Sequence, residues 1–126
     1  MKDNIVCSGA LFYSTSTKRF LFLQRTEQKT QGLWGLVGGK SKFTESAFEG
    51  LKREIEEEVG STPKFKKVIP LEMFTSNDQK FFFHTYLIAT ESEFMPKLNE
   101  EHSGYCWCAF ECWPKNLHMG LKNTLN

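Results

Sequence analysis

The feature that most constrains the fold is a well-marked helix in the middle of the chain. Ser46 and Glu49 form an S-x-x-E capping box, in which each side chain satisfies a backbone N–H at the helix start. Gly60 supplies the left-handed residue that commonly ends a helix. Between these ends, apolar residues recur at spacings of three and four and predict one buried face: Ala47, Phe48, Leu51, Ile55 and Val59.

Apolar segments before and after this helix predict β-strands. The expected strands are Ile5 to Tyr13, Arg19 to Arg25, Lys66 to Phe74 with an interruption at Pro70, Gln79 to Ala89, and Tyr105 to Phe110. Ser14 to Lys18 is the expected turn between the first two. The segment Leu117 to Leu125 predicts a short terminal helix. Strands on both sides of the central helix predict an α/β fold, a mixed sheet packed between helices.

The strand from Gln79 to Ala89 contains a nearly continuous apolar run, which is typical of a strand buried on both faces. Phe81, Phe82 and Phe83 are therefore expected in the core rather than as a platform for a nucleobase.

The overall composition narrows the class of protein. At 126 residues, 40% of them hydrophobic, the chain is expected to form one globular domain, residues 1–126. A net charge of +1 gives no electrostatic reason to expect long nucleic acid as a partner. The first ten residues lack the apolar core of a signal peptide, and no segment approaches the length of a membrane span. We expect a cytoplasmic protein with no membrane partner, and the sequence leaves monomer and homodimer open.

The four cysteines, Cys7, Cys106, Cys108 and Cys112, are expected to be small buried hydrophobes. Their spacing lacks paired C-x₂-C units, so no zinc site is predicted.

Four glutamates lie at the C-terminal end of the helix: Glu54, Glu56, Glu57 and Glu58. This position is unfavourable for acids by roughly 0.3–1 kcal/mol each, because the helix dipole is negative there. At about 100° per residue, Glu54, Glu57 and Glu58 share an arc that borders the apolar face, whereas Glu56 points to solvent. Crowded, half-buried carboxylates either keep their protons or bind a cation, and hard oxygen ligands favour Mg²⁺ or Mn²⁺.

The residues around this cluster carry a further pattern. Gly38-Gly39-Lys40 predicts a tight turn before the helix, whose backbone can approach a ligand closely. Residues 39–61 then resemble the Nudix box, G-x₅-E-x₇-R-E-U-x-E-E-x-G-U, where U is aliphatic. The matching positions are Gly39, Glu45, Arg53, Glu54, Ile55, Glu57, Glu58 and Gly60. Ser61 departs from the final aliphatic position, and Val37 stands where many members have proline.

The resemblance implies an α/β/α sandwich and a Mg²⁺-dependent hydrolase, with Mn²⁺ as the alternative ion. It implies Glu54, Glu57 and Glu58 as metal ligands, the Gly39 carbonyl as an additional one, and Arg53 and Glu45 as supports. Members often add a carboxylate from outside the box; Glu101 resembles that position, with Glu100 as the neighbouring alternative. The expected catalytic group is therefore Glu54 or Glu57 as base, with Glu101 as the rival and Arg53 as the support.

Three residues outside the acidic cluster are candidates for substrate contacts. Arg25 and Lys40 are candidates to bind phosphate, with surface solvation as the alternative, above all for Lys40. Trp34 is expected either to stack on a base or sugar or to anchor its loop. The expected reaction is hydrolysis of a pyrophosphate linkage in a nucleoside triphosphate or related diphosphate derivative. Dinucleoside polyphosphates, nucleotide sugars and capped RNA ends remain open as substrates. The rival hypotheses are a catalytically silent nucleotide-binding or regulatory module, and an unrelated domain with an accidental match.

Overall fold

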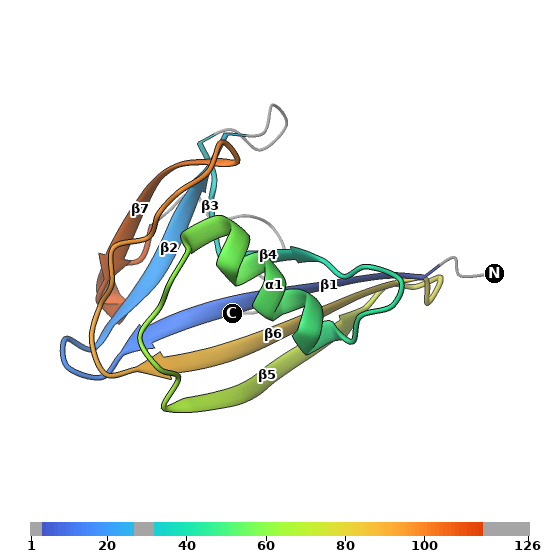
Figure 1. Cartoon of the computed structure of the whole chain (residues 1–126). Coiled ribbons are helices and arrows are strands. Elements are labelled where there is room, and N and C mark those ends of the chain that lie inside the picture. Colours follow the sequence, from blue (N-terminus) through green and yellow to red (C-terminus); the bar gives the residue numbers. More distant parts are fainter. Residues whose placement is uncertain (1–3, 27–31, 115–126) are drawn as a thin grey trace.

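A computed structural model describes residues 4–26 and 32–114, which form a mixed β-sheet with one α-helix against it (Figure 1). The strands are β1 (Ile5–Ser14), β2 (Arg19–Arg25), β3 (Trp34–Gly35), β4 (Val37–Lys40), β5 (Lys67–Thr75), β6 (Phe81–Thr90) and β7 (His102–Cys108). The helix is α1 (Ala47–Val59), and a 3-10 turn, η1 (Phe110–Cys112), follows β7. The expected α/β fold with a mixed sheet is confirmed. The predicted helix from Leu117 to Leu125 lies outside the described residues.

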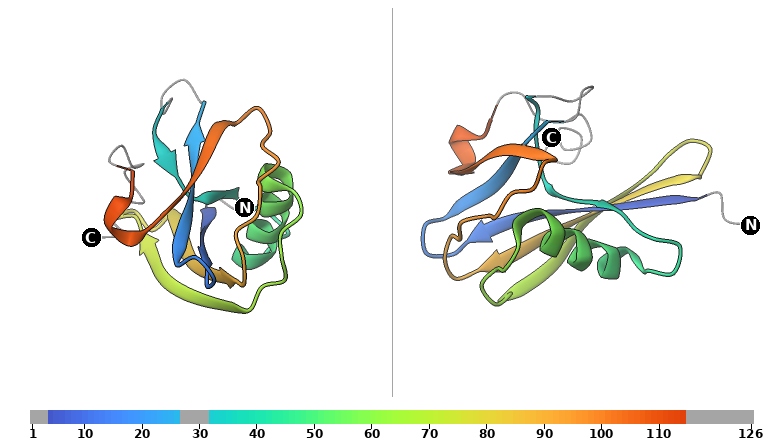
Figure 2. Two further views of the ribbon diagram at one scale, coloured as in Figure 1. Left: turned by 90° about the vertical axis from the view of Figure 1, so that its left-hand side faces the viewer. Right: turned by 45° about the horizontal axis from the view of Figure 1, so that its top comes forward.

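The sheet has the order β3-β2-β1-β6-β5, with β4 paired to β1 and β7 paired to β2. The β1–β6 pair is parallel over the whole length of β1, from Ile5 opposite Phe81 to Ser14 opposite Thr90. All other pairs are antiparallel. Figure 1 shows β2 and β7 turning away from β1, and Figure 2 shows the same divergence from two other sides. The strand β2 pairs with only the last two residues of β1. Further towards the N-terminus of β1, β4 pairs with it instead.

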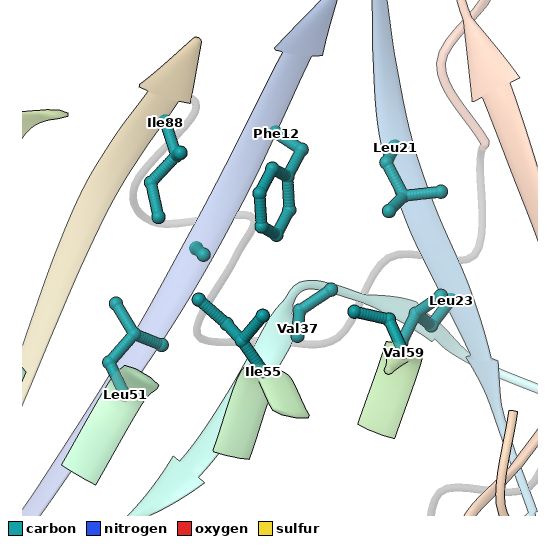
Figure 3. Close-up of a cluster of buried hydrophobic side chains, with 9 residues drawn as sticks. Phe12, Leu21, Leu23, Val37, Leu51, Ile55, Val59 and Ile88 are labelled. Carbon is teal, nitrogen blue, oxygen red and sulfur yellow. The ribbon is translucent and has the colours of Figure 1, made fainter. Parts of the chain in front are cut away.

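The helix begins and ends where the sequence predicts. The Ser46 hydroxyl accepts from the Glu49 backbone N–H, and the Glu49 carboxylate accepts from the Ser46 N–H. Gly60 ends the helix with φ +80°. Leu51, Ile55 and Val59 point from α1 into the core, towards side chains of β1, β2, β4 and β6 (Figure 3). This packing fixes the rotation of α1, and with it the directions of the glutamates.

Four predictions about strands and turns need correction. Gly38, Gly39 and Lys40 do not form a tight turn but lie in β4, paired with β1. The strand β6 is not buried along its whole length: its first four residues are half-buried, and its fully buried residues lie from Thr85 onward. The last predicted strand begins earlier and ends at Cys108.

The strand interrupted at Pro70 is instead one continuous edge strand. It contains a bulge between Pro70 and Glu72. Proline in an edge strand costs no ladder hydrogen bond, which makes this position acceptable.

Candidate active site

Two glutamates of α1 lie one helical turn apart beside β4. Glu58 is only 2% exposed, and the Gly38 N–H donates to its Oε1 at 3.0 Å. Burial raises the pKa of Glu58 to about 9, with the nearby Glu54 and Glu101 charges adding to the effect. Burial also raises the pKa of Glu54, whose carboxyl group interacts directly with that of Glu58. In the absence of a cation, Glu54 and Glu58 therefore retain a proton between them at neutral pH.

Arg53 is the hub of the surrounding ion-pair network. Its Nε and Nη2 donate to the two oxygens of Glu45 at 2.8 and 3.0 Å, a bidentate pair. Its Nη1 donates to Glu54 at 3.3 Å and to Glu57 at 3.1 Å, and Nη2 also donates to the Lys40 carbonyl at 3.0 Å. Hydrogen bonds from Arg53 lower the pKa of Glu45 to about 2, so Glu45 stays ionised. The network ties the loop entering α1 to the carboxylates, and the positioning role of Arg53 stays a prediction.

Glu57 differs from its two neighbours. Its side chain is 51% exposed and pairs with Arg53. The expectation that Glu54, Glu57 and Glu58 are all partly buried therefore holds for two of them. The carboxylates of Glu57 and Glu54 share the Nη1 of Arg53, so Glu57 lies near Glu54 but on the exposed side of the helix.

The buried glutamate pair faces a cavity of about 340 Å³. Arg25, Lys40 and Glu101 also line this cavity, as do Gly38 and Gly39. A second, more open cavity of about 680 Å³ adjoins it and shares Lys40 and Glu54. Acidic and basic side chains from four parts of the chain thus meet in one hollow. This is the arrangement expected for a site that holds a cation together with a phosphate chain.

The loop carrying Glu101 is fastened to the helix end. The Asn99 amide donates to the Glu57 carbonyl at 3.0 Å, and its oxygen accepts from the Glu101 N–H at 2.9 Å. The Glu101 carbonyl accepts from the Thr26 N–H at 3.0 Å. Through these bonds the Glu101 carboxylate lies near Glu58 and lines the cavity. Its neighbour Glu100 is exposed and does not line it.

Trp34 lies elsewhere. It is half-buried in β3 and packs against the cluster built on Leu11 and Phe22, which is the loop-anchoring alternative. It is not among the residues that line the two cavities at Glu54. Phe81 and Phe83 line the smaller cavity, although the sequence predicted them only as core residues. Their alternation along the strand was the available signal, but the neighbouring Phe82 hid it within an apolar run.

Comparison with known proteins shows the family to which the chain belongs. The sequence pattern of the NUDIX domain matches residues 4–125 of the 126. The chain belongs to the Nudix family. Members are pyrophosphohydrolases, generally of nucleoside diphosphate derivatives, and typically depend on a divalent metal. The expectation of a Nudix hydrolase is confirmed. No curated protein sequence matches the chain.

Solved structures of Nudix proteins share the fold over most of the chain. The MutT NUDIX hydrolase from Burkholderia pseudomallei is 25% identical, with a TM-score of 0.78 and 97% of this chain and 95% of that one covered. The MutT protein from Methanosarcina mazei Go1 is 26% identical, with a TM-score of 0.70 and coverage of 98% and 91%. An Ap4A hydrolase from C. elegans, 18% identical, shares the fold with a TM-score of 0.72 over 96% of this chain and 92% of that one.

The donor set of this Nudix site fits a hard divalent ion. The raised pKa values of Glu54 and Glu58 mean that both carboxylates are costly to ionise unless a cation neutralises them. The Glu101 carboxylate and the backbone of Gly39 line the same cavity and add oxygen ligands of the kind that a hard ion prefers. Within residues 4–26 and 32–114, no three acidic, histidine or cysteine side chains already converge on one point. None of the described helices has the length and apolar character needed to cross a membrane.

Gly39 keeps the space in which the Glu54 carboxylate lies. A Cβ at residue 39 would lie 2.6 Å from Cδ of Glu54. Since this atom ends a flexible side chain, Gly39→Ala displaces the carboxylate while the fold persists. We expect a melting temperature close to that of the wild type and a fall in kcat/KM of roughly 100-fold, the scale of an ångström's misplacement in an active site.

Gly104→Ala is the matched control for Gly39→Ala, because a Cβ there meets only Gln24 at an ordinary 3.7 Å. Equal activity in the two alanine variants would show that the position of the Glu54 carboxylate is unimportant.

Proposed function

We propose that this protein hydrolyses a pyrophosphate linkage in a nucleoside triphosphate or a related nucleoside diphosphate derivative, with Mg²⁺ as the cofactor and Mn²⁺ as the alternative. The observation that carries the proposal is the buried Glu54–Glu58 pair, which faces the same cavity as Arg25, Lys40 and Glu101. Two adjacent carboxyl groups that are costly to ionise without a cation favour an ion at that point, and the two cations favour an anionic substrate.

Glu54, Glu58 and Glu101 are the proposed side-chain ligands of the ion, with the Gly39 carbonyl as a further ligand and Glu57 as an outer one. The divalent ion supplies screening of the diphosphate charge and a lower pKa of the attacking water. Arg25 and Lys40 line the same cavity and are proposed to bind the phosphate oxygens. The substrate is thereby held against the acidic wall despite its own charge.

Glu54 is the proposed general base, because it lines both cavities and Arg53 holds it. Its carboxylate takes a proton from the attacking water, and the anhydride bond breaks as the water oxygen bonds to phosphorus. Glu101 is the alternative base on the same cavity. Glu57, which pairs with Arg53, is proposed to help position Arg53 rather than to take the proton.

A substrate panel tests the proposal. Nucleoside triphosphates, nucleotide sugars and dinucleoside polyphosphates are incubated with Mg²⁺ or Mn²⁺, and the products are separated by chromatography. Dihydroneopterin triphosphate is included because an E. coli enzyme that shares the fold is named for it, with 24% identity and a TM-score of 0.61. We expect cleavage of anhydrides, and none of simple phosphomonoesters or without a metal. Nucleotide binding without turnover of any anhydride would instead identify a silent binding module.

A further inference from the structure

Two of the four cysteines lie in contact with each other on β7. None of the four is fully buried, contrary to the prediction from the sequence, and Cys106 and Cys108 are half-buried. The thiol of Cys108 donates to the sulfur of Cys106 at 3.1 Å. The sulfur atoms of a disulfide are about 2.05 Å apart, so this pair needs to approach by only about 1 Å to form a bond.

Strand geometry explains why these sulfurs meet and what a bond between them requires. Cys106 and Cys108 are two residues apart in β7, so their side chains share one face of the sheet. Two residues of a strand span about 6.4–6.8 Å, which is the upper end of the Cα separation found in disulfides. A bond therefore requires β7 to shorten between the two residues, and the resulting strain makes the bond easy to reduce.

The position of Cys108 allows this movement at little cost. Cys108 is the last residue of β7, and its pairing with Phe20 is the last pair between β7 and β2. Among the described strands, β7 pairs with β2 alone, so no second strand holds it in place. Cys106 is held more firmly, because it packs against the cluster built on Leu11 and Phe22. Closing the bond thus disturbs one pair at the end of an edge strand.

The surroundings of Cys106 decide which thiol reacts first. Burial raises the pKa of the Cys106 thiol to about 12, and the hydrogen bond from Cys108 adds to the effect. Cys106 therefore stays protonated at neutral pH, whereas a thiol reacts with an oxidant as its thiolate. Cys108 is thus the residue that an oxidant attacks first, and Cys106 lies beside the product.

We propose that Cys106 and Cys108 are a site of reversible oxidation by hydrogen peroxide. In the first step the sulfur of Cys108 takes one peroxide oxygen, which forms a sulfenic acid and releases water. In the second step the sulfur of Cys106 attacks that of Cys108, the sulfur–oxygen bond breaks, and a second water leaves with the proton of the Cys106 thiol. The two thiols lose two electrons and two protons, which the peroxide receives. A dithiol reductant restores both thiols.

The second thiol determines how far the oxidation proceeds. A sulfenic acid without a neighbouring thiol is oxidised further to a sulfinic acid, which dithiol reductants do not reverse. With Cys106 in contact, the reaction stops at the disulfide. Neither cysteine lines the cavities at Glu54, so this site is independent of the proposed hydrolase function.

Cleavage of the chain between the two cysteines tests the proposal. The full chain is treated with hydrogen peroxide, the remaining thiols are blocked with iodoacetamide, and a chymotryptic digest is analysed by mass spectrometry. Chymotrypsin cuts after Trp107, so the fragments that carry Cys106 and Cys108 separate unless a disulfide joins them. We expect the fragments to stay joined, with two hydrogen atoms fewer than the free peptides, and to separate after treatment with dithiothreitol.

Two alanine variants identify the partners. Cys106→Ala keeps an apolar side chain against the core, and we expect Cys108 in this variant to end as a sulfinic acid. Cys112→Ala is the matched control, because Cys112 is exposed on η1, and its fragments should stay joined as in the wild type.

Three results would overturn the proposal. The first is separation of the fragments from the oxidised wild type, which needs no variant. The second is loss of the link in Cys112→Ala, which would make Cys112 a partner in the bond. The third is a Cys108 that remains an unmodified thiol in Cys106→Ala after the same peroxide treatment.

Discussion

Replacing Glu54 with glutamine is expected to lower kcat by about 10²- to 10⁴-fold, the range that a positioned general base contributes. Glutamine keeps the size of the side chain but cannot take a proton from water, and it is a weaker ligand for a hard cation. The loss should appear in kcat as well as in kcat/KM, because the interaction is made as the water attacks. Steady-state kinetics on the best anhydride of the panel provide the measurement.

The control for this prediction lies on the same helix. Glu56 is exposed and faces solvent, so Glu56→Gln changes the charge of α1 equally without touching the cavity. We expect near-normal turnover from Glu56→Gln and an unchanged melting temperature in both variants. Near-normal turnover in Glu54→Gln would remove Glu54 from the mechanism and leave Glu101 as the candidate base.

Replacing Glu58 with glutamine is expected to stabilise the metal-free protein at alkaline pH and to abolish its stabilisation by Mg²⁺ or Mn²⁺. The folded-state pKa of Glu58 is about 9, against an ordinary value of 4.5. Between these values the folded protein binds a proton that the unfolded chain has lost, so stability falls as pH rises from about 4.5 to 9. Glutamine resembles the protonated acid, can still accept from the Gly38 N–H, and removes this dependence.

Thermal melts in EDTA at pH 6 and pH 9, repeated with Mn²⁺, measure both effects. Wild type should lose more stability than Glu58→Gln between the two pH values and regain it with the metal, whereas the variant should not respond to the metal. Glu56→Gln should follow the wild type throughout. A Glu58→Gln protein that Mn²⁺ stabilises as strongly as the wild type would show that Glu58 is not a ligand.

The sequence was most informative where local interactions decide the structure. Capping, periodicity and a terminal glycine depend on residues within a few positions of one another, so the limits of α1 followed from Ser46, Glu49 and Gly60. The rotation of the helix followed from the apolar face, and it correctly predicted the burial of Glu58 and the exposure of Glu56.

Features set by distant contacts were not predictable in the same way. Gly38 and Gly39 carry no side-chain pattern, so their pairing with β1 as β4 depends on where β2 leaves that edge. Helix geometry predicted a partly buried Glu57, but its side chain is exposed and shares Arg53 with Glu54, a contact that the sequence alone did not give. The sequence also could not show whether Phe81 and Phe83 lie on the face of the sheet that α1 covers, because this depends on how the distant helix packs.

The most direct test of the central claim is anomalous diffraction from a crystal soaked in Mn²⁺ at mildly alkaline pH. We predict an ion beside the Gly39 carbonyl, with carboxylate oxygens of Glu54 and Glu58 at about 2.0–2.3 Å and Glu101 in the same coordination shell or linked by water. An ion bound away from this cavity, or no ion at all after the soak, would contradict the account.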